Sequence, residues 1–370
     1  MQQNPRLRHE NTLNQKPCAN QSSDVYSLGT WWGAMQTISV VIPFYQCETG
    51  VLARTLLSIE AQVIPTGWRL QAVLVDDGSP LPARHEIKGV DLTAPRFLKV
   101  VEQANKGVGA ARNHGLDIAI PESTAIAFLD SDDIWPAGHI ARAIAALEAG
   151  FDFYFTDNRR DKSHESHIRS RYSARTAQLI DQTGQTSGLV ELPQDKIVGF
   201  CLREFPCQAS TIVYRASVAP LLRFPTHLKY SGEDVLFMTE LLARSTRVGF
   251  DHDGMVECGD GVNIYFKNLA WDAPRFLNIK VDQMLTYRAL AKADFLSTSN
   301  KALSRDLLEI ATSQLSFHVI RTLVKNPKKA VGQLWRLFTT DIGAGAKVLV
   351  ATPKTIFAKL LGRAVPVEVD

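Results

Sequence analysis

The chain has 370 residues, of which 45% are apolar and 21% are charged, and its net charge is +3. This composition is typical of a globular protein with a hydrophobic core, and so mild a positive charge argues against nucleic acid as a partner. The length suits one large domain with an appendage, or two domains.

Strand and helix patterns alternate from Thr37 onward, after a leader at residues 1–36 that is rich in Asn, Gln and Ser and is predicted to be disordered. Apolar and β-branched runs predict strands at Ile38–Ile42, Leu70–Val75, Phe97–Val101, Ala125–Leu129, Phe151–Phe155 and Ser210–Tyr214. Helical periodicity predicts helices at Val51–Gln62, Val108–Ile120, Gly138–Leu147 and Asp234–Leu242. This alternation implies an α/β fold with a largely parallel, doubly wound sheet.

Two regions depart from the alternation. Residues 157–190 are polar, lack periodicity and predict a long loop or insertion. After about Pro274 only helical patterns remain, with breaks near Asn326-Pro327 and Gly343. We therefore expect three parts, which are the leader at 1–36, an α/β domain at 37–270 and a helical C-terminal extension at 271–370.

Polar clusters follow three predicted strands, at the sheet edge where open α/β folds bind ligands. They are Pro43-Phe44-Tyr45, Asp76-Asp77-Gly78-Ser79 and Asp130-Ser131-Asp132-Asp133. The three carboxylates of the last cluster repel one another unless a cation or solvent intervenes. A divalent cation such as Mg²⁺ or Mn²⁺, which also binds phosphate oxygens, is the natural partner. A solvated turn or a helix N-cap is the alternative.

Three motifs each allow a functional and a structural interpretation. Asp76 binds a base or ribose, or the Asp77-Gly78 pair only forms a turn. The loop Asn105–Asn113 offers N–H groups and an arginine to phosphate, or its glycines serve packing. Gly232-Glu233-Asp234 supplies a general base, or its carboxylates stabilise a helix N-terminus.

In this order the motifs resemble those of the family 2 glycosyltransferases, which have the GT-A fold. The resemblance covers roughly residues 37–250 and rests on Val40–Tyr45, Val75–Ser79, Asn105–Asn113, Phe128–Asp133 and Gly232–Asp234. It implies inverting transfer of a sugar from a nucleotide-diphosphate sugar, most commonly a UDP-sugar, to a hydroxyl of a saccharide or lipid-linked acceptor. It also implies a role in bacterial cell-surface polysaccharide or glycolipid synthesis.

The resemblance further implies a role for each matching residue. Asp234 would be the catalytic base, with Glu233 beside it. Asp132 would be the direct metal ligand, together with Asp130. The residues expected to bind the nucleotide sugar are Pro43, Tyr45, Glu48, Asp76, Asp77, Asn105, Lys106, Gly107, Arg112, Asp130 and Ser131.

One feature common in the family is missing from the sequence. Family members often carry a basic or His-containing segment after the base, which closes over the diphosphate. The corresponding stretch here, Glu257–Asn263, contains neither His nor Arg. His252 is the nearest histidine, and a lone histidine is more often structural.

The C-terminal extension is basic and in places amphipathic. Eight Lys and Arg residues between Lys325 and Arg363 are interleaved with Leu, Val, Trp335 and Phe338. A basic amphipathic helix can lie on an anionic membrane surface, where it would meet a lipid-linked acceptor. A helix packed on the catalytic domain, with a solvated basic face, is the alternative.

Other functions fit the sequence less well. A catalytically inactive sugar-nucleotide-binding partner of another transferase is the main alternative, but the acidic cluster and Gly232–Asp234 favour an enzyme. A nucleotidyltransferase would need a Gly-rich, Arg-containing loop where Pro43-Phe44-Tyr45 stands. A dehydrogenase would need a dinucleotide fingerprint after the first strand, and none is present.

Cysteine usage and hydropathy give an expectation for the compartment. The five cysteines show no CxxC or Cys/His metal spacing, which predicts free thiols in a reducing compartment. The first 30 residues lack the apolar core of a signal peptide, and no run of about 18 apolar residues occurs. We expect a cytoplasmic protein, located at the inner face of the plasma membrane if it binds lipid.

Overall fold

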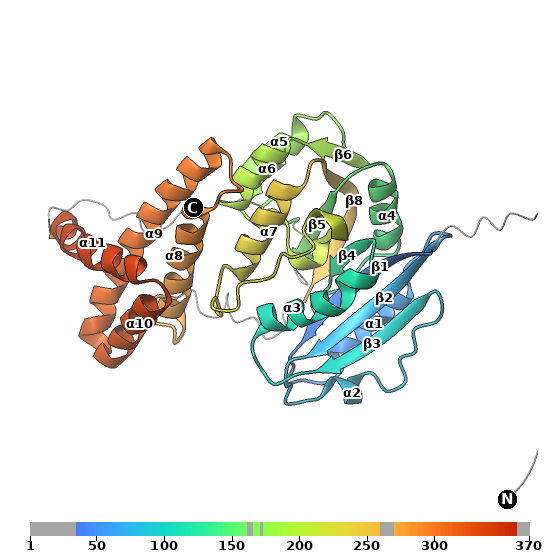
Figure 1. Ribbon diagram of the computed structural model, residues 1–370, viewed down its shortest axis with the longest axis horizontal. Coiled ribbons are helices and arrows are strands. Elements are labelled where there is room, and N and C mark those ends of the chain that lie inside the picture. Colours follow the sequence, from blue (N-terminus) through green and yellow to red (C-terminus); the bar gives the residue numbers. More distant parts are fainter. Residues whose placement is uncertain (1–34, 161–165, 171–172, 260–269, 361–370) are drawn as a thin grey trace, which may run out of the picture. The chain divides into compact units, whose positions relative to one another are not determined.

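The computed structural model describes residues 35–160, 166–170, 173–259 and 270–360. In this part of the chain, eight strands form one mixed sheet with the order β3-β2-β1-β4-β7-β5-β8-β6 (Figure 1). The strands are β1 (Gln36–Phe44), β2 (Trp68–Asp76), β3 (Arg96–Glu102), β4 (Ala125–Phe128), β5 (Phe153–Arg160), β6 (Leu189–Leu192), β7 (Ile212–Arg215) and β8 (Val248–Cys258). The six predicted strands are therefore present, and β6 and β8 are additional.

The parallel half of the sheet brings four strand ends to one edge. Strand β1 pairs in parallel with β2 and β4, and β2 pairs in parallel with β3. Strand β7 is antiparallel to β4 and β5, whereas β5 and β8 are parallel and β6 is antiparallel to β8. This arrangement confirms the predicted α/β fold with a mostly parallel sheet.

Strand β1 illustrates why these segments are strands. It lies between β2 and β4, and its residues after Gln36 are buried, as expected for a central parallel strand rich in β-branched side chains. The pairing of β1 with β4 ends at Val41. Pro43 lies beyond this point, so the absence of its N–H group costs no hydrogen bond between these two strands.

Helices cover both faces of the sheet. Leu52, Leu56 and Ile140 pack in one buried cluster with Ile38 and Val40, and Leu116 and Phe237 pack with Val41 on the other face. The helices are α1 (Val51–Glu60), α2 (Ala83–Glu86), α3 (Val108–Ala119), α4 (His139–Glu148), α5 (Ala174–Asp181), α6 (Gln194–Cys201), α7 (Glu233–Arg244), α8 (Phe276–Lys292), α9 (Thr298–Lys325), α10 (Pro327–Thr340) and α11 (Ile342–Leu360). The doubly wound arrangement is thus as predicted.

The prediction of a long loop at residues 157–190 is wrong. Strand β5 continues to Arg160, and α5 and the start of β6 also fall in this region. The region escaped detection because its buried positions include polar residues, such as Asp157 and Asn158, and α5 is short. Glu204 stabilises the start of α5 by accepting hydrogen bonds from the N–H groups of Arg175 and Thr176, each at 3.0 Å.

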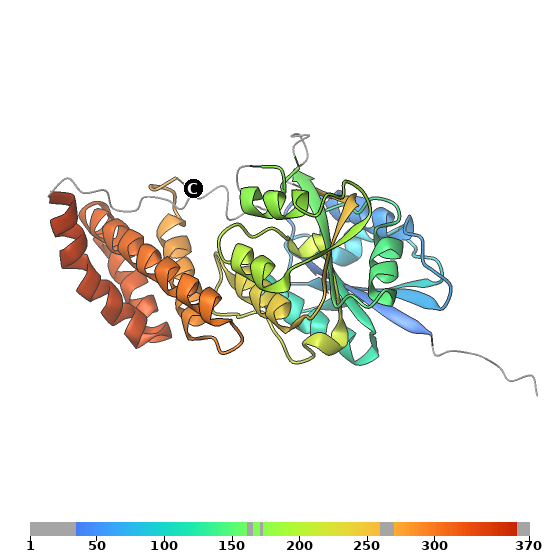
Figure 2. The same ribbon diagram turned by 90° about the horizontal axis from the view of Figure 1, so that it is seen from above.

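Helices α8 to α11 form a layer with its own apolar core, which includes Leu277, Leu315, Leu337 and Val348 (Figure 2). Leu228, from the segment that precedes α7, is buried in the same core. Residues Met35–Asp370 form one compact unit, so the division into 37–270 and 271–370 stays a prediction. Most of the predicted leader lies outside the described residues.

Two further expectations bear on the compartment. The four cysteines in the described ranges, Cys47, Cys201, Cys207 and Cys258, are free thiols. In the same ranges, no helix has both the length and the apolar character needed to cross a lipid bilayer.

Candidate active site

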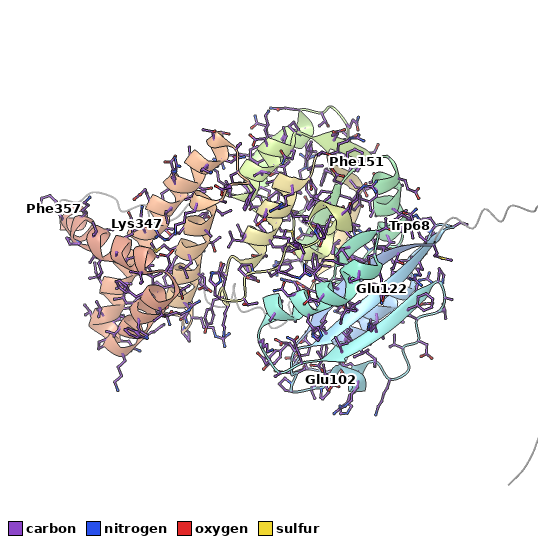
Figure 3. The ribbon with its side chains drawn as sticks, in the orientation of Figure 1. Trp68, Glu102, Glu122, Phe151, Lys347 and Phe357 are labelled. Atoms are coloured by element: carbon purple, nitrogen blue, oxygen red, sulfur yellow. The ribbon has the colours of Figure 1, made fainter. Side chains whose placement is uncertain are left out.

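The carboxyl edge of the parallel strands carries most of the predicted site residues. The register pairs Phe44 with Asp76 and Asp76 with Glu102, so these strand ends are neighbours. In Figure 3, Trp68 at the start of β2 and Glu102 at the end of β3 mark the two opposite edges of the sheet.

Asp76 and Asp77 shape the backbone at this edge. The two carboxylate oxygens of buried Asp76 accept hydrogen bonds from the N–H groups of Ser79, at 2.8 Å, and Ala83, at 2.7 Å. The carboxylate of buried Asp77 accepts from the N–H groups of Lys106 and Gly107, both at 2.8 Å. Asp77 therefore fixes the loop that the sequence predicts to face phosphate.

Gly78 is required between these loops. Its φ is +66°, and a Cβ there would lie 2.9 Å from the main-chain nitrogen of Asn105. The loop ends at Gly107, which has a φ of +93° and directly precedes α3. The side chains of Asn105 and Lys106 are exposed, and so are those of Tyr45 and Glu48 in the segment after β1.

Several polar residues that the sequence did not suggest join the strand ends. The Gln46 N–H donates to Ser79 Oγ at 2.7 Å, and the Gln46 amide donates to Ser131 Oγ at 3.3 Å. Thr55 of α1 donates to the Ser131 carbonyl at 2.9 Å. No sequence pattern identifies these residues, because each contact joins segments far apart in the chain.

Arg112 connects the strand edge to the start of α7. Its Nη2 lies 2.7 Å from Asp130 Oδ1, and its Nη1 lies 3.8 Å from Glu233 Oε1. The guanidinium also lies over the Phe224 ring, at 5.3 Å from the centroid. Burial opposes its charge, but the nearby carboxylates of Asp130 and Glu233 raise the pKa of Arg112.

The paired carboxylates at the start of α7 are half-buried beside this arginine. Burial and the adjacent Asp234 raise the pKa of Glu233 to about 8, although Arg112 opposes the shift. Burial also raises the pKa of Asp234, and Arg112 again opposes it. A raised pKa makes a carboxylate a stronger proton acceptor, as general-base catalysis requires.

The loop before α7 is held by the C-terminal helices. Gly232 has a φ of +88°, and a Cβ at this position would overlap Thr286 Oγ1 of α8. Asp282 of α8, which is fully buried, accepts from the N–H groups of Lys229, at 2.9 Å, and Tyr230, at 2.8 Å. Arg336 of α10 forms an ion pair with the same carboxylate.

The acidic cluster after β4 divides into buried and accessible members. Asp133 is buried and accepts from the Gly259 N–H at 2.8 Å, and burial with Asp130 and Asp132 raises its pKa to about 8. Asp130 is partly exposed, with 37% of its side chain accessible, and Asp132 is also partly exposed. A Cβ at position 259 would lie 2.5 Å from the Asp132 carbonyl oxygen, so the end of β8 approaches this loop closely.

Within the described ranges, no three His, Cys, Asp or Glu side chains are grouped so that they alone could hold a metal ion. The partly exposed carboxylates of Asp130 and Asp132 are hard oxygen donors of the kind that Mg²⁺ and Mn²⁺ bind together with phosphate oxygens. The stretch at 257–263, which corresponds to the family's closing segment but lacks its His or Arg, is described only as far as Gly259.

Comparisons with known proteins show the family to which the chain belongs. The sequence model of the family described as Glycosyl transferase family 2 matches residues 39–204. The succinoglycan biosynthesis protein ExoW of Rhizobium meliloti is 32% identical over 245 residues, which cover 66% of this chain and 75% of that protein. The chain belongs to glycosyltransferase family 2.

Two further proteins are similar to this family 2 glycosyltransferase. The UDP-Glc:alpha-D-GlcNAc-diphosphoundecaprenol beta-1,3-glucosyltransferase WfaP of Escherichia coli is 28% identical over 124 residues, covering 34% of this chain and 46% of WfaP. The crystal structure of residues 1–349 of TarS from S. aureus, in complex with UDP-GlcNAc, superposes with a TM-score of 0.55 at 17% identity, covering 89% of this chain and 93% of that one. The latter match confirms the GT-A fold.

Proposed function

We propose that this family 2 glycosyltransferase transfers a sugar, with inversion, from a nucleotide-diphosphate sugar to an acceptor hydroxyl in polysaccharide or glycolipid synthesis. The observation that carries the proposal is the joining of two acidic groups by one buried arginine. Arg112 contacts Asp130 after β4 and Glu233 at the start of α7, although these segments are far apart in the sequence. Inverting transfer needs a base on one side of the sugar and charge stabilisation of the leaving group on the other.

The strand edge is suited to the nucleoside and diphosphate. Each Asp76 oxygen accepts one main-chain N–H and retains acceptor capacity for a nucleoside hydroxyl or N–H. Tyr45 is exposed next to the end of β1 and could cover a base, while Pro43 sets the end of the strand and Glu48 lies in the following segment. The exposed side chains of Asn105 and Lys106, beside the N-terminus of α3, would face the anionic part of the donor, while Asp77 holds the N–H groups of Lys106 and Gly107.

Asp132, together with Asp130, would hold a divalent cation, either Mg²⁺ or Mn²⁺. Asp130 is bound to Arg112, and Ser131 is held between the two carboxylates by Gln46 and Thr55. The family resemblance favours Asp132 as the direct ligand. When bound, the cation neutralises charge on the diphosphate leaving group. Two protein carboxylates would leave the other ligand positions of the cation to diphosphate oxygens and water.

The chemical step needs a base and a leaving group. The Asp234 carboxylate, beside Glu233, removes the proton from the acceptor hydroxyl as that oxygen bonds to the anomeric carbon. The bond from the anomeric carbon to the diphosphate breaks with its electron pair, and the nucleoside diphosphate departs. Arg112 supplies fixed positive charge between the acidic groups throughout.

The names of the relatives support the substrate classes. WfaP is named for a UDP-sugar donor and a diphosphoundecaprenol-linked acceptor, and TarS was crystallised with UDP-GlcNAc. We therefore propose a UDP-sugar donor and a saccharide or lipid-linked acceptor. The free cysteines support the proposal of a cytoplasmic location.

Calorimetry with a panel of nucleotide sugars, in the presence of Mn²⁺ or of a chelator, tests the donor site. We expect one donor to bind in Mn²⁺ and to lose affinity in chelator. If no donor binds to the folded protein, the proposal is wrong, and a donor that binds without any transfer would identify an inactive sugar-nucleotide-binding partner. Product analysis with the donor that binds then establishes whether the anomeric configuration inverts.

A further inference from the structure

Helix α11 exposes an apolar stripe to solvent. Ile342, Leu349, Val350 and Phe357 have 76%, 53%, 66% and 64% of their surface accessible. Their spacing of seven or eight residues places them on one face of the helix. Figure 3 shows Phe357 and Lys347 along this helix.

The stripe is not needed to build the fold. The opposite face of α11 is also apolar, and its Ala344 and Val348 are buried with Leu337 of α10 in the core of the helical layer. An exposed apolar stripe of this kind marks a surface that protein or lipid covers. On α10, Val331 and Trp335 are 58% and 71% exposed and lie one turn apart, opposite Leu337.

The charge carried by these helices is one-sided, although Asp282 of α8 pairs with Arg336 and Glu309 of α9 pairs with Lys347. Residues 321–360 contain eight Lys and Arg residues and a single acidic residue, Asp341. The Asp341 carboxylate already pairs with Arg288 and Lys292. Lys328 and Lys354 are exposed on the same faces as the apolar side chains, three residues from Val331 and from Phe357.

We propose that α10 and α11 dock the protein onto an anionic lipid bilayer. Apolar side chains flanked by lysines match a surface with acyl chains beneath anionic headgroups. Two copies of so basic a face would repel each other, which disfavours a symmetric dimer through it. No helix in the described ranges can cross a bilayer, so α10 and α11 would lie in the plane of the interface. This inference does not depend on the proposed reaction.

Sedimentation of the full chain with vesicles tests the proposal. We expect binding to vesicles of phosphatidylglycerol and phosphatidylcholine, weak binding to phosphatidylcholine alone, and weaker binding as salt is added. The double variant Leu349→Ser, Val350→Ser should bind at least about tenfold more weakly, since two exposed apolar groups are lost. Lys328→Glu combined with Lys354→Glu should remove the preference for anionic vesicles.

Leu221→Ser is the matched control, because Leu221 is 90% exposed but lies outside the C-terminal helices. It should bind like the unmodified chain, and thermal melting should show that all variants are folded. Equal binding by the Leu349→Ser, Val350→Ser variant, or no binding to anionic vesicles by the unmodified chain, would overturn the proposal. A concentration-dependent dimer that this variant abolishes would instead identify a second copy as the occupant.

Discussion

The carboxylate of Asp282 accepts a hydrogen bond from the main-chain N–H of Tyr230 at 2.8 Å, and so ties the C-terminal helices to the segment that leads to Glu233 and Asp234. Arg336 compensates the buried charge of that carboxylate from a second helix. The placement of the proposed base therefore depends on residues outside the motifs of the family.

Asp282→Asn should lower kcat about tenfold while leaving the KM for donor nearly unchanged. The segment Lys229–Gly232 before the proposed base, here called the base loop, loses hydrogen bonds to the Asp282 carboxylate, whereas the strand edge that binds the donor is unchanged. Loss of one partner of a buried ion pair should also cost ~3 kcal/mol of stability. Steady-state kinetics and denaturation measure both. Asp341→Asn is the matched control, since Asp341 pairs with Arg288 but does not contact the base loop. If it lowers kcat equally, Asp282 has no specific positioning role.

Asp234→Asn should leave donor binding intact and reduce transfer by at least about 100-fold, since general-base catalysis contributes that much. Glu233→Gln should have a smaller effect that arises through its contact with Arg112. Donor calorimetry and a transfer assay on both variants distinguish the two. Full activity in Asp234→Asn with loss in Glu233→Gln would assign the base to Glu233.

Asp132→Ala should abolish the metal-dependent part of donor binding. The remaining affinity should equal that of the unmodified protein in chelator, because the nucleoside contacts at the strand edge remain. Calorimetry with and without Mn²⁺ measures this difference. Gln46→Ala, which removes an amide near Ser131 but no carboxylate, should retain a response to Mn²⁺. A full response to Mn²⁺ in Asp132→Ala would exclude this residue as a ligand.

Glu233 should make the protein less stable as the pH rises from about 4.5 to about 8. Its pKa is raised from 4.5 to about 8 in the folded chain, so the folded state binds more protons than the unfolded state across this window. The stabilisation is complete below pH 4.5 and is lost as the pH passes through 8. Urea denaturation at pH 5 and pH 8 should show a smaller loss in Glu233→Gln than in the unmodified chain. Equal losses would show that the pKa of Glu233 is not raised.

Gly232→Ala should destabilise the protein and lower kcat, because a Cβ there meets both an unfavourable φ and the Thr286 hydroxyl. Gly184→Ala is the matched control, since Gly184 has a φ of +72° with open space around it. The control should cost only the ~1–2 kcal/mol of the left-handed conformation and leave kcat unchanged. Denaturation of both variants measures the cost of the strained backbone, and their kcat values show whether the loop before α7 is displaced.

The parallel half of the fold was predictable because its signals are local. A buried β-branched run such as Ile38–Ile42, followed by polar residues, marks both a strand and its functional end. The elements between 157 and 190 were missed because buried Asp157 and Asn158 remove the hydrophobic pattern. There the decisive contact is Glu204 at the start of α5, which no local pattern reveals.

Within the site, residue identities were easier to predict than their partners. The clusters at Asp76 and Asp130 were found from the sequence, but the role of Asp77 in holding the loop at Lys106 and Gly107 was not. The support of the base loop by Asp282 is a contact over more than 50 residues, and Asp282 lies in an otherwise ordinary helical pattern. Such contacts follow from packing, which a single sequence does not specify.

Trp335 and Arg336 are neighbours on α10, yet one faces solvent and the other reaches the carboxylate beneath the base loop. A shortened chain that ends at Asn326 would keep every motif by which the family is recognised. It would still lose Arg336 and the core residues that α10 and α11 contribute, such as Leu337 and Val348. Exchanging these helices between relatives would likewise alter the scaffold behind Asp234. In a chimaera that joins two relatives within the segment before α7, helices α8 and α10 should therefore come from the same parent as α7.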